Sequence, residues 1–291
     1  MKTIDREYVA RHLPHRPDDA HKGTMGTLCS ITGSYGCAGA AILSARAALR
    51  SGVGLHIQVL PAPIYPIYAG AVPESVCVPV VGSSVGTFCR ADLPAILDSV
   101  ARSTAVVIGC GMGNTPDTRA VLQELILNSE APLVIDADGI NALAANIDIL
   151  KEHQSDVILT PHIKEFSRLT GLCVTDILAR QAEVAAAFAQ EHPGVTLVLK
   201  SHRTVVARDD ELYLNTIGNS GMAKGGSGDA LAGIIGSLSA QGLDPLPAAV
   251  SGVYIHAAAG DLATERLGKT AMLPSDLIDA LSGVYRSFEA D

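Results

Sequence analysis

Short runs of β-branched and apolar residues alternate along this chain with longer stretches rich in Ala and Leu, and this alternation restricts the fold more than any other feature. The runs are typical of strands, and the stretches between them have the length of helices. Strands that alternate with helices predict a largely parallel central sheet with helices on both faces, which is an α/β fold. We expect strands at residues 27–32, 55–60, 76–81, 105–108, 133–135, 157–159 and 196–199.

The pattern changes in the last third of the chain. Residues 204–207 and 212–215 flank a charged turn and predict a hairpin. Because no internal repeat or long linker divides the sequence, we expect residues 1–291 to form a single domain. Helices are expected at residues 38–51 and 118–128, and three more follow the hairpin, at 229–240, 247–267 and 275–288, with Ser275 as the N-cap of the last.

Charge and hydropathy exclude some partners. The 291 residues include 30 acidic and 21 basic ones, and the net charge of -9 repels a nucleic acid backbone. Residues 1–17 lack the apolar run of a signal peptide, and Gly, Pro or charged residues interrupt every apolar stretch before it reaches membrane-spanning length. We therefore expect a cytoplasmic protein that binds neither nucleic acid nor membrane.

The cysteines are scattered, without a Cys-x-x-Cys pair, and most lie in apolar contexts. They predict reduced thiols in the core rather than a disulfide framework or a zinc site. Their positions are Cys29, Cys37, Cys77, Cys89, Cys110 and Cys173.

The most informative segment is the loop Gly225-Gly226-Ser227-Gly228, which leads directly into Asp229 and an apolar helix. Its glycines place bare backbone N–H groups at the helix N-terminus, where the helix dipole favours an anion such as a nucleotide phosphate. Asp229 either caps the helix or accepts a proton from an attacking hydroxyl group during phosphoryl transfer. We favour the second role, because a purely structural helix start would be weakened by the preceding glycines.

The loop and its acid resemble the anion hole of ribokinase-like enzymes, and further motifs look like those of the ADP- or ATP-dependent NAD(P)H-hydrate dehydratases. Each motif alone is a weak signal, but the ordered set, which covers nearly the whole chain, is specific. Pro is usual in the family where this chain has Cys110 and Ile163. The similar segments are His21–Gly26, Ile31–Ser34, Gly39–Ala41, Ala47–Leu55, Gly109–Gly113, Asp136–Asp138, Thr160–Glu165 and Gly218–Asn219.

The resemblance implies a ribokinase-like fold and the repair of damaged nicotinamide cofactors. In that activity the (S)-hydrate of NADH or NADPH loses water while ADP gives AMP and phosphate, or while ATP is used, and Mg2+ bridges the phosphates. Asp229 is implied as the catalytic base. The implied phosphate site is Gly225, Gly226, Ser227 and Gly228; the implied nucleotide site is Lys200, Ser201, His202, Arg203, Thr204 and Gly228; the implied hydrate site is Ala40, Ala41, Gly111, Gly113, His162 and Asp229.

Without the resemblance, several of these assignments stay open. The turn Gly109–Gly113 has one residue between its last two glycines, where a Rossmann turn has two, so it is either a substrate-binding turn or a tight turn without a ligand. Lys200 and Arg203 suit an anion or a surface turn equally well. His162 suits a ligand contact or an ordinary solvated position. His256 interrupts an apolar helix and is expected to be a core histidine.

Two other functions would use the same loop. A small-molecule kinase, of the hydroxyethylthiazole or sugar kinase type, would release a phosphorylated product, but the segment His21–Gly23 favours the dehydratase. A nucleotide sensor without turnover would have no need of Asp229 as a base. The resemblance also implies a homo-oligomer, a tetramer, and a separate hydrate epimerase, since only about twenty residues precede His21. It assigns no protein ligand to the metal.

Overall fold

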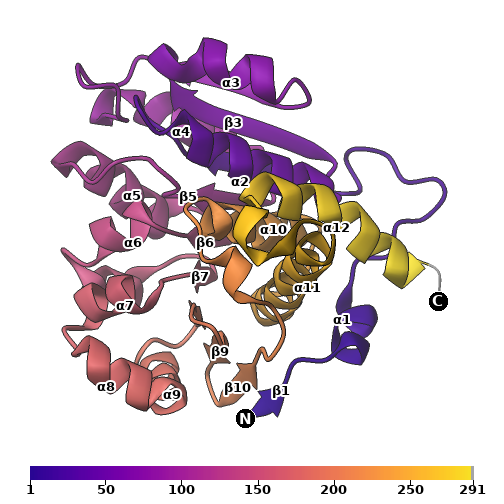
Figure 1. Cartoon of the computed structure of the whole chain (residues 1–291). Helices are drawn as coiled ribbons and strands as arrows, with labels where there is room; N and C mark the ends of the chain where they lie inside the picture. The colour runs from indigo at the N-terminus through magenta and orange to yellow at the C-terminus, as the bar shows by residue number, and fades with distance from the viewer. Residues whose placement is uncertain (290–291) are drawn as a thin grey trace.

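The strands form one mixed sheet in the computed structural model, which describes residues 1–289 (Figure 1). The sheet order is β1-β10-β9-β8-β7-β6-β5-β2-β3-β4, and the strands from β8 to β4 run parallel, which confirms the predicted sheet. The strands are β1 (Lys2–Thr3), β2 (Thr27–Ile31), β3 (Leu55–Pro61), β4 (Val76–Val80), β5 (Ala105–Ile108), β6 (Leu133–Ile135), β7 (Val157–Leu159), β8 (Val195–Leu199), β9 (Val205–Arg208) and β10 (Glu211–Leu214).

The predicted hairpin is present at one end of this sheet. Strands β9 and β10 pair antiparallel, and β9 continues the sheet from β8, also antiparallel. The short strand β1 pairs parallel with β10, so a segment from the start of the chain extends the edge that the hairpin forms. The sequence did not predict β1, because two residues are too few for a periodic pattern.

Helices connect the strands and cover the sheet. The α-helices are α1 (Arg6–His12), α2 (Ala38–Arg50), α3 (Tyr65–Ala71), α4 (Leu93–Ala101), α5 (Pro116–Asn128), α6 (Asp138–Leu143), α7 (Ile163–Thr170), α8 (Val174–Ala179), α9 (Gln181–Glu191), α10 (Ser227–Ala240), α11 (Pro245–Ala271) and α12 (Pro274–Glu289). Short 3-10 helices occur at Ala62–Ile64, Arg90–Asp92, Ile147–Glu152 and Ser220–Met222. Within residues 1–289, no helix is both long enough and apolar enough to cross a membrane.

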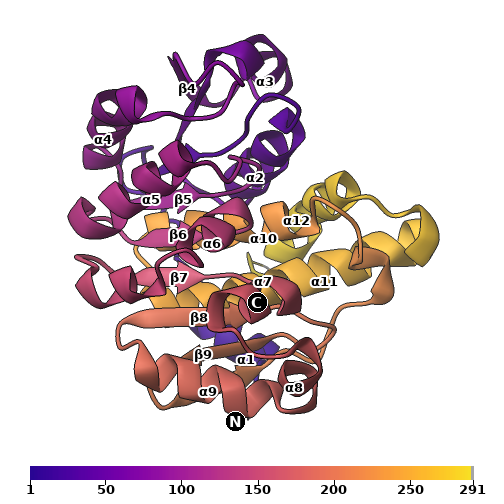
Figure 2. The same ribbon diagram turned by 90° about the vertical axis from the view of Figure 1, so that its left-hand side faces the viewer.

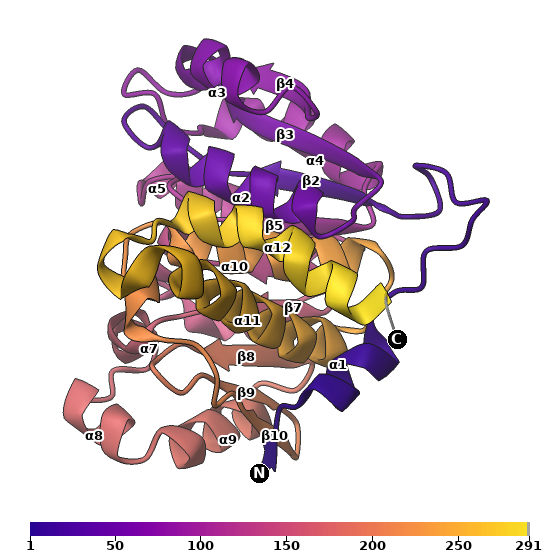
Figure 3. The same ribbon diagram turned by 45° about the vertical axis from the view of Figure 1, so that its right-hand side comes forward.

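The two faces of the sheet carry separate hydrophobic cores. Helices α1, α2, α10, α11 and α12 lie on one face (Figure 3), and α4 to α9 lie toward the other (Figure 2). Side chains of β5 alternate between the cores: Val106 and Ile108 belong to one, and Ala105 and Val107 to the other. Burial on both faces explains why the parallel strands are continuously apolar in sequence.

Helix α10 packs very closely against its neighbour α2. A Cβ atom placed on Gly233 in α10 would lie 2.1 Å from the backbone carbonyl oxygen of Ser44 in α2. Glycine is needed at this point because only a residue without a side chain allows the two backbones to approach so closely. The packing fixes the position of α10, and therefore of the loop that precedes it.

The sequence predicted Ser275 as the N-cap of the last helix, and this prediction is wrong. Helix α12 begins one residue earlier, at Pro274, because proline suits the first helical turn, where its missing N–H is not needed. The carboxylate of Asp276 accepts a hydrogen bond from the backbone N–H of Leu273 at 2.8 Å. Asp276, and not Ser275, therefore satisfies a free donor at this helix start.

The prediction of core thiols is right for some cysteines and wrong for others. Cys29 and Cys110 are fully buried, and Cys77 and Cys89 are partly buried. Cys37 and Cys173 are exposed, because they lie in the segments just before α2 and α8 instead of inside a strand or helix. All six are free thiols.

Candidate active site

Four neighbouring parallel strands end at the same edge of the sheet, and polar side chains follow each of them. Cys110 lies just beyond β5, Asp136 directly after β6, Thr160 directly after β7 and Lys200 directly after β8. In open α/β sheets, ligands bind beyond the carboxyl ends of the strands. The order of the strands therefore gathers these side chains at a position suited to a ligand.

A buried ion pair forms the centre of this group. The Nζ atom of Lys200 donates to Oδ1 of Asp136 at 2.6 Å, and the Thr160 hydroxyl donates to the same oxygen at 2.7 Å. Burial opposes ionisation of Asp136, but the charge and hydrogen bond of Lys200 outweigh it, so the pKa of Asp136 is lowered. Burial also opposes the charge on Lys200, yet Asp136 and Glu165 leave its pKa raised. Both groups are therefore charged at neutral pH.

The N-terminus of α10 faces the same place. Gly226 is the N-cap in a left-handed conformation with φ 99°, and a Cβ atom there would lie 2.5 Å from Leu43. The first hydrogen bond of the helix runs from the Ala230 N–H to the Gly226 carbonyl at 3.1 Å, so helix geometry leaves the N–H groups of Gly228 and Asp229 without an acceptor in the helix. A Cβ on Gly228 would lie 3.0 Å from Nζ of Lys200. The ammonium group and the helix N-terminus together form a site for an anion.

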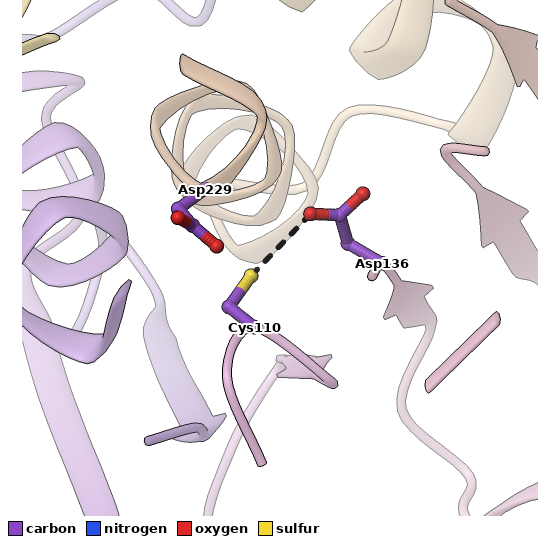
Figure 4. A group of neighbouring side chains, drawn as sticks. All are labelled: Cys110, Asp136 and Asp229. Carbon is purple, nitrogen blue, oxygen red and sulfur yellow. Dashed lines mark hydrogen bonds between the residues drawn. The ribbon is translucent and has the colours of Figure 1, made fainter. Parts of the chain in front are cut away.

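Asp229 points from the first turn of α10 toward Cys110 (Figure 4). The Cys110 sulfur and one carboxylate oxygen each of Asp136 and Asp229 all lie within 4.8 Å of one another. Burial, followed by the charge of Asp136, raises the pKa of Asp229 to about 6. Because Gly226 is the N-cap, Asp229 is not the capping residue, and its raised pKa leaves a carboxylate that can take up a proton close to neutral pH.

His256, predicted to be a core histidine, is buried in α11 and supports the loop. Its Nε2 atom lies 2.9 Å from the carbonyl oxygen of Ser227, so this nitrogen carries the proton and donates it. Burial lowers the pKa of His256 to about 4, and the ring is neutral at physiological pH. The hydrogen bond ties the start of α10 to α11.

His162 has a structural role in addition to any contact with a ligand. It is the N-cap of α7: its Nδ1 atom accepts from the Glu165 N–H at 3.0 Å, and Glu165 accepts from the His162 N–H at 2.8 Å. Because Nδ1 accepts, the proton is on Nε2, which lies 3.2 Å from Oε1 of Glu165. The side chain of His162 is 49% exposed, and its backbone pairs with Lys200. The ring is therefore fixed and accessible beside the ion pair.

The turn from Lys200 to Thr204 presents its side chains in two directions. Lys200 points inward to Asp136, whereas His202 and Arg203 are exposed. The Ser201 hydroxyl accepts from the Arg203 N–H at 3.0 Å and shapes the turn. Of the predicted nucleotide residues, Lys200 is thus the one whose side chain reaches the glycine loop.

The residues predicted to bind the hydrate are only partly brought together. A Cβ atom on Gly111 would lie 2.8 Å from the Cβ of Ala40, so these two residues are in contact. The Gly113 N–H donates to a carboxylate oxygen of Asp138 at 2.9 Å. Ala41, by contrast, is completely buried behind this surface. Ala40 and Gly111 therefore lie side by side, Gly113 is held by Asp138, and Ala41 belongs to the core.

The charged groups of the site do not fit a resident magnesium ion. Mg2+ prefers oxygen ligands in octahedral geometry, whereas the cluster offers one thiol, and burial raises the pKa of Cys110 well above its usual value. Oδ1 of Asp136 already accepts from Lys200 and Thr160. The cluster therefore offers too few free oxygen ligands for a resident magnesium ion.

The fold and this site together define the ribokinase-like class of α/β proteins. A profile of the NAD(P)H-hydrate dehydratase family matches residues 28–282. This chain belongs to that family. A hydroxyethylthiazole kinase from Pyrococcus horikoshii is 16% identical, with a TM-score of 0.63, and shares the fold.

Individual relatives agree with this placement. The ADP-dependent (S)-NAD(P)H-hydrate dehydratase of Bacillus subtilis is 34% identical over 97% of this chain and 97% of its own length. A crystal structure of the ADP/ATP-dependent enzyme from Bacillus subtilis, co-crystallized with ATP and Mg2+, has a TM-score of 0.83 at 30% identity and covers 99% of this chain and 98% of its own. The bifunctional NAD(P)H-hydrate repair enzyme of Moorella thermoacetica is 39% identical over 100% of this chain and 55% of its own length. The chain spans about half the length of such bifunctional relatives.

Sequence reasoning assigned no role to Asp136 or Cys110. Both lie just after predicted strands, and polar residues at that position of a parallel sheet were the available signal. The partner of Asp136 was not visible, because Lys200 is 64 residues away in sequence. Ala137, which follows Asp136, has a positive φ of 48°, an uncommon conformation for alanine that accompanies the sharp turn into α6.

Proposed function

We propose that the protein restores NADH or NADPH from its (S)-hydrate, using the phosphoryl group of ADP and releasing AMP and phosphate. The observation that carries this proposal is the placement of the Asp229 carboxylate beside an anion site built from Lys200 and the start of α10. Family membership supports the choice of substrate, and the names of the stand-alone relatives from Neisseria meningitidis and Bacillus subtilis support ADP as the donor. ATP is the alternative donor.

The chemistry follows from the hydrate and from the site. In the hydrate, C6 of the nicotinamide ring carries a hydroxyl group. Asp229, with a pKa of about 6, is mostly ionised at neutral pH and removes the proton of this hydroxyl as its oxygen attacks the terminal phosphorus. The bond from that phosphorus to the nucleotide breaks, and AMP leaves. The phosphate ester at C6 is a better leaving group than hydroxide. Phosphate departs with the electron pair of the C6–O bond while the lone pair of the ring nitrogen forms a C=N bond to C6. Loss of a proton from C5 to solvent then forms the C5–C6 double bond and returns the lone pair to nitrogen.

The remaining predicted residues bind and orient. Lys200 and the N–H groups of Gly225, Gly226, Gly228 and Asp229 hold the phosphates, and their preorganised charge stabilises the phosphoryl group in transit. The Ser227 N–H donates to the carbonyl oxygen of Lys224 at 3.3 Å and shapes the loop. The turn Ser201–Thr204 binds the rest of the nucleotide. Ala40, Gly111, Gly113 and His162 hold the hydrate. Magnesium, where present, neutralises the phosphate charge.

A small-molecule kinase of the same fold is the second candidate that shares the base and the anion site. It would stop after phosphoryl transfer and release the phosphorylated product. Nothing in the geometry of Asp229 favours it over the dehydratase, and the likeness to the hydroxyethylthiazole kinase is one of fold. A nucleotide sensor is disfavoured, because it gains nothing from a carboxylate whose pKa is held at about 6.

The direct test is recovery of the absorbance of reduced nicotinamide when the protein is mixed with hydrated NADH, magnesium and either ADP or ATP. We expect recovery with ADP, and Asp229→Asn should lower kcat by about 10²–10⁴-fold, the usual contribution of a general base. Asp117→Asn is the matched control, since Asp117 lies on the surface in α5, and it should retain wild-type activity. Failure of recovery with both nucleotides would overturn the proposal and favour a kinase.

Assembly and location complete the proposal. We place the protein in the cytoplasm, as a tetramer that works beside a separate hydrate epimerase, on the resemblance to the family. The mass in solution, measured by light scattering with and without ADP, tests the tetramer. A mass equal to one chain at working concentration would contradict it.

A further inference from the structure

We propose that Cys110 is a positioning residue whose thiol donates a hydrogen bond to the Asp229 carboxylate and keeps this base ionised in a site crowded with negative charge. The inference rests on the proposed function of Asp229 and extends it to a residue that has had no role. It concerns the thiol as a neutral donor and requires no oxidation or metal.

Geometry places the thiol between two carboxylates. Cys110 Sγ lies 3.6 Å from Oδ2 of Asp136 and donates to it, and a carboxylate oxygen of Asp229 lies within 4.8 Å of both groups. Figure 4 shows the three side chains converging from the loop after β5, from the end of β6 and from α10. Rotation of the S–H group about the Cβ–Sγ bond turns the donor from the Asp136 carboxylate toward that of Asp229 and leaves the sulfur in place.

Asp136 does not depend on the thiol. Its Oδ1 atom accepts from Lys200 at 2.6 Å and from Thr160 at 2.7 Å, so its charge is satisfied by other donors. Asp229 has a poorer environment: burial and the charges of Asp136 and Asp138 raise its pKa, and a hydrogen bond from the Cys110 thiol acts in the opposite direction. The thiol is therefore most useful when it turns to Asp229.

The other charges that act on Asp229 come from several elements. Asp136 after β6 and Asp138 at the start of α6 raise the pKa of Asp229, while Lys200 after β8 lowers it. The charge of Lys200 in turn acts to lower the pKa of Glu165 and of His162 at the start of α7. Because none of these groups changes when Cys110 is replaced, the effect of the thiol can be measured separately.

The thiol is also suited to remain a donor. Burial raises the pKa of Cys110 well above its usual value, and the charges of Asp229 and Asp136 raise it further. The group stays protonated at physiological pH, so it adds no third negative charge to the site. A serine hydroxyl would be a stronger donor on a shorter bond, and an alanine would provide none.

The experiment compares pH profiles of kcat/KM for the wild type, Cys110→Ala and Cys110→Ser with hydrated NADH and ADP. Loss of the donor should raise the pKa of Asp229, and a rise of about one unit converts to a fivefold loss of kcat/KM near pH 6 and almost none near pH 8. Cys110→Ser should restore the profile. Cys29→Ala, which removes a fully buried thiol in β2, is the control and should leave the acid limb unchanged.

Two outcomes would overturn the proposal. An acid limb of Cys110→Ala that superimposes on the wild type shows that the thiol does not influence the base, and an equal loss at every pH shows a merely structural role. A carbon NMR titration of the Asp229 carboxyl group in the wild type and in Cys110→Ala gives the same comparison without catalysis. If the wild type has no dehydratase activity, the proposed function fails, and an unchanged titration then overturns this inference independently.

Discussion

Two lysine–aspartate pairs in this molecule have the same geometry but opposite exposure. Nζ lies 2.6 Å from a carboxylate oxygen in both Lys200–Asp136 and Lys151–Asp148. The side chains of the first pair are 18% and 2% exposed, and those of the second are 61% and 75% exposed. Replacing each lysine by methionine therefore separates the effect of burial from that of distance.

The stability that Lys200→Met should lose follows from the free-energy cost of leaving a buried charge without a partner. Removing one member of a buried ion pair typically destabilises a protein by about 3–5 kcal/mol, which is a large part of a total stability of roughly 5–15 kcal/mol. We expect Lys200→Met to lose this amount at neutral pH, because Asp136 remains buried and charged. Lys151→Met should cause no measurable loss, since water screens the exposed pair.

The loss of stability in Lys200→Met depends on pH through the pKa of Asp136. In the wild type the pKa of Asp136 is lowered, so its contribution to stability is present above the pKa of an unfolded Asp and is lost as the pH falls through the lower folded value. Without Lys200, burial raises this pKa instead. The loss in Lys200→Met should then be largest at neutral pH and should shrink as Asp136 takes up a proton on acidification.

Urea unfolding at about pH 7.5 and about pH 5 measures both predictions. Adding Asp136→Asn to Lys200→Met removes the unpaired charge and should recover much of the stability at the higher pH. A loss below about 1 kcal/mol at the higher pH, or one that does not change with pH, would refute the reasoning that the pair is electrostatically buried.

Two further predictions concern packing and thiol reactivity. Gly233→Ala forces α2 and α10 apart, since its Cβ would lie 2.1 Å from the Ser44 carbonyl oxygen, and should cost about 1–3 kcal/mol in thermal unfolding; an unchanged melting temperature would contradict this. Cys173 is exposed and its pKa is lowered by hydrogen bonds from Thr175, so it should react with a thiol reagent in the folded protein well before Cys110, which is buried. Mass spectrometry of digested samples checks the order, and early labelling of Cys110 would be inconsistent with it.

The sequence located the inner strands accurately because their ends are set locally. Strands β5, β6 and β7 have the predicted bounds. Each is an apolar run buried on both faces and followed by a glycine or a polar residue. The edges of the sheet were harder: β1 is held by pairing with β10, a contact between distant segments that leaves no periodic pattern.

The candidate site was predictable only where one segment carries it. The glycines and Asp229 are adjacent in sequence, so the anion loop and its acid were visible, although α10 begins at Ser227, two residues before the predicted start. The pairing of Lys200 with Asp136 and the approach of Cys110 to Asp229 depend on the order of strands in the sheet. No local propensity encodes that order, which emerges from packing of the whole core.

The convergence of four strand ends also has a consequence for folding. Because side chains alternate along a strand, a slip of β6 by one residue would turn Asp136 to the opposite face and leave Lys200 without its partner. The proposed activity should therefore depend on correct strand alignment across the centre of the sheet. In a refolding experiment, we expect compactness and helix content to return before the proposed activity, which requires all four strands to be in register.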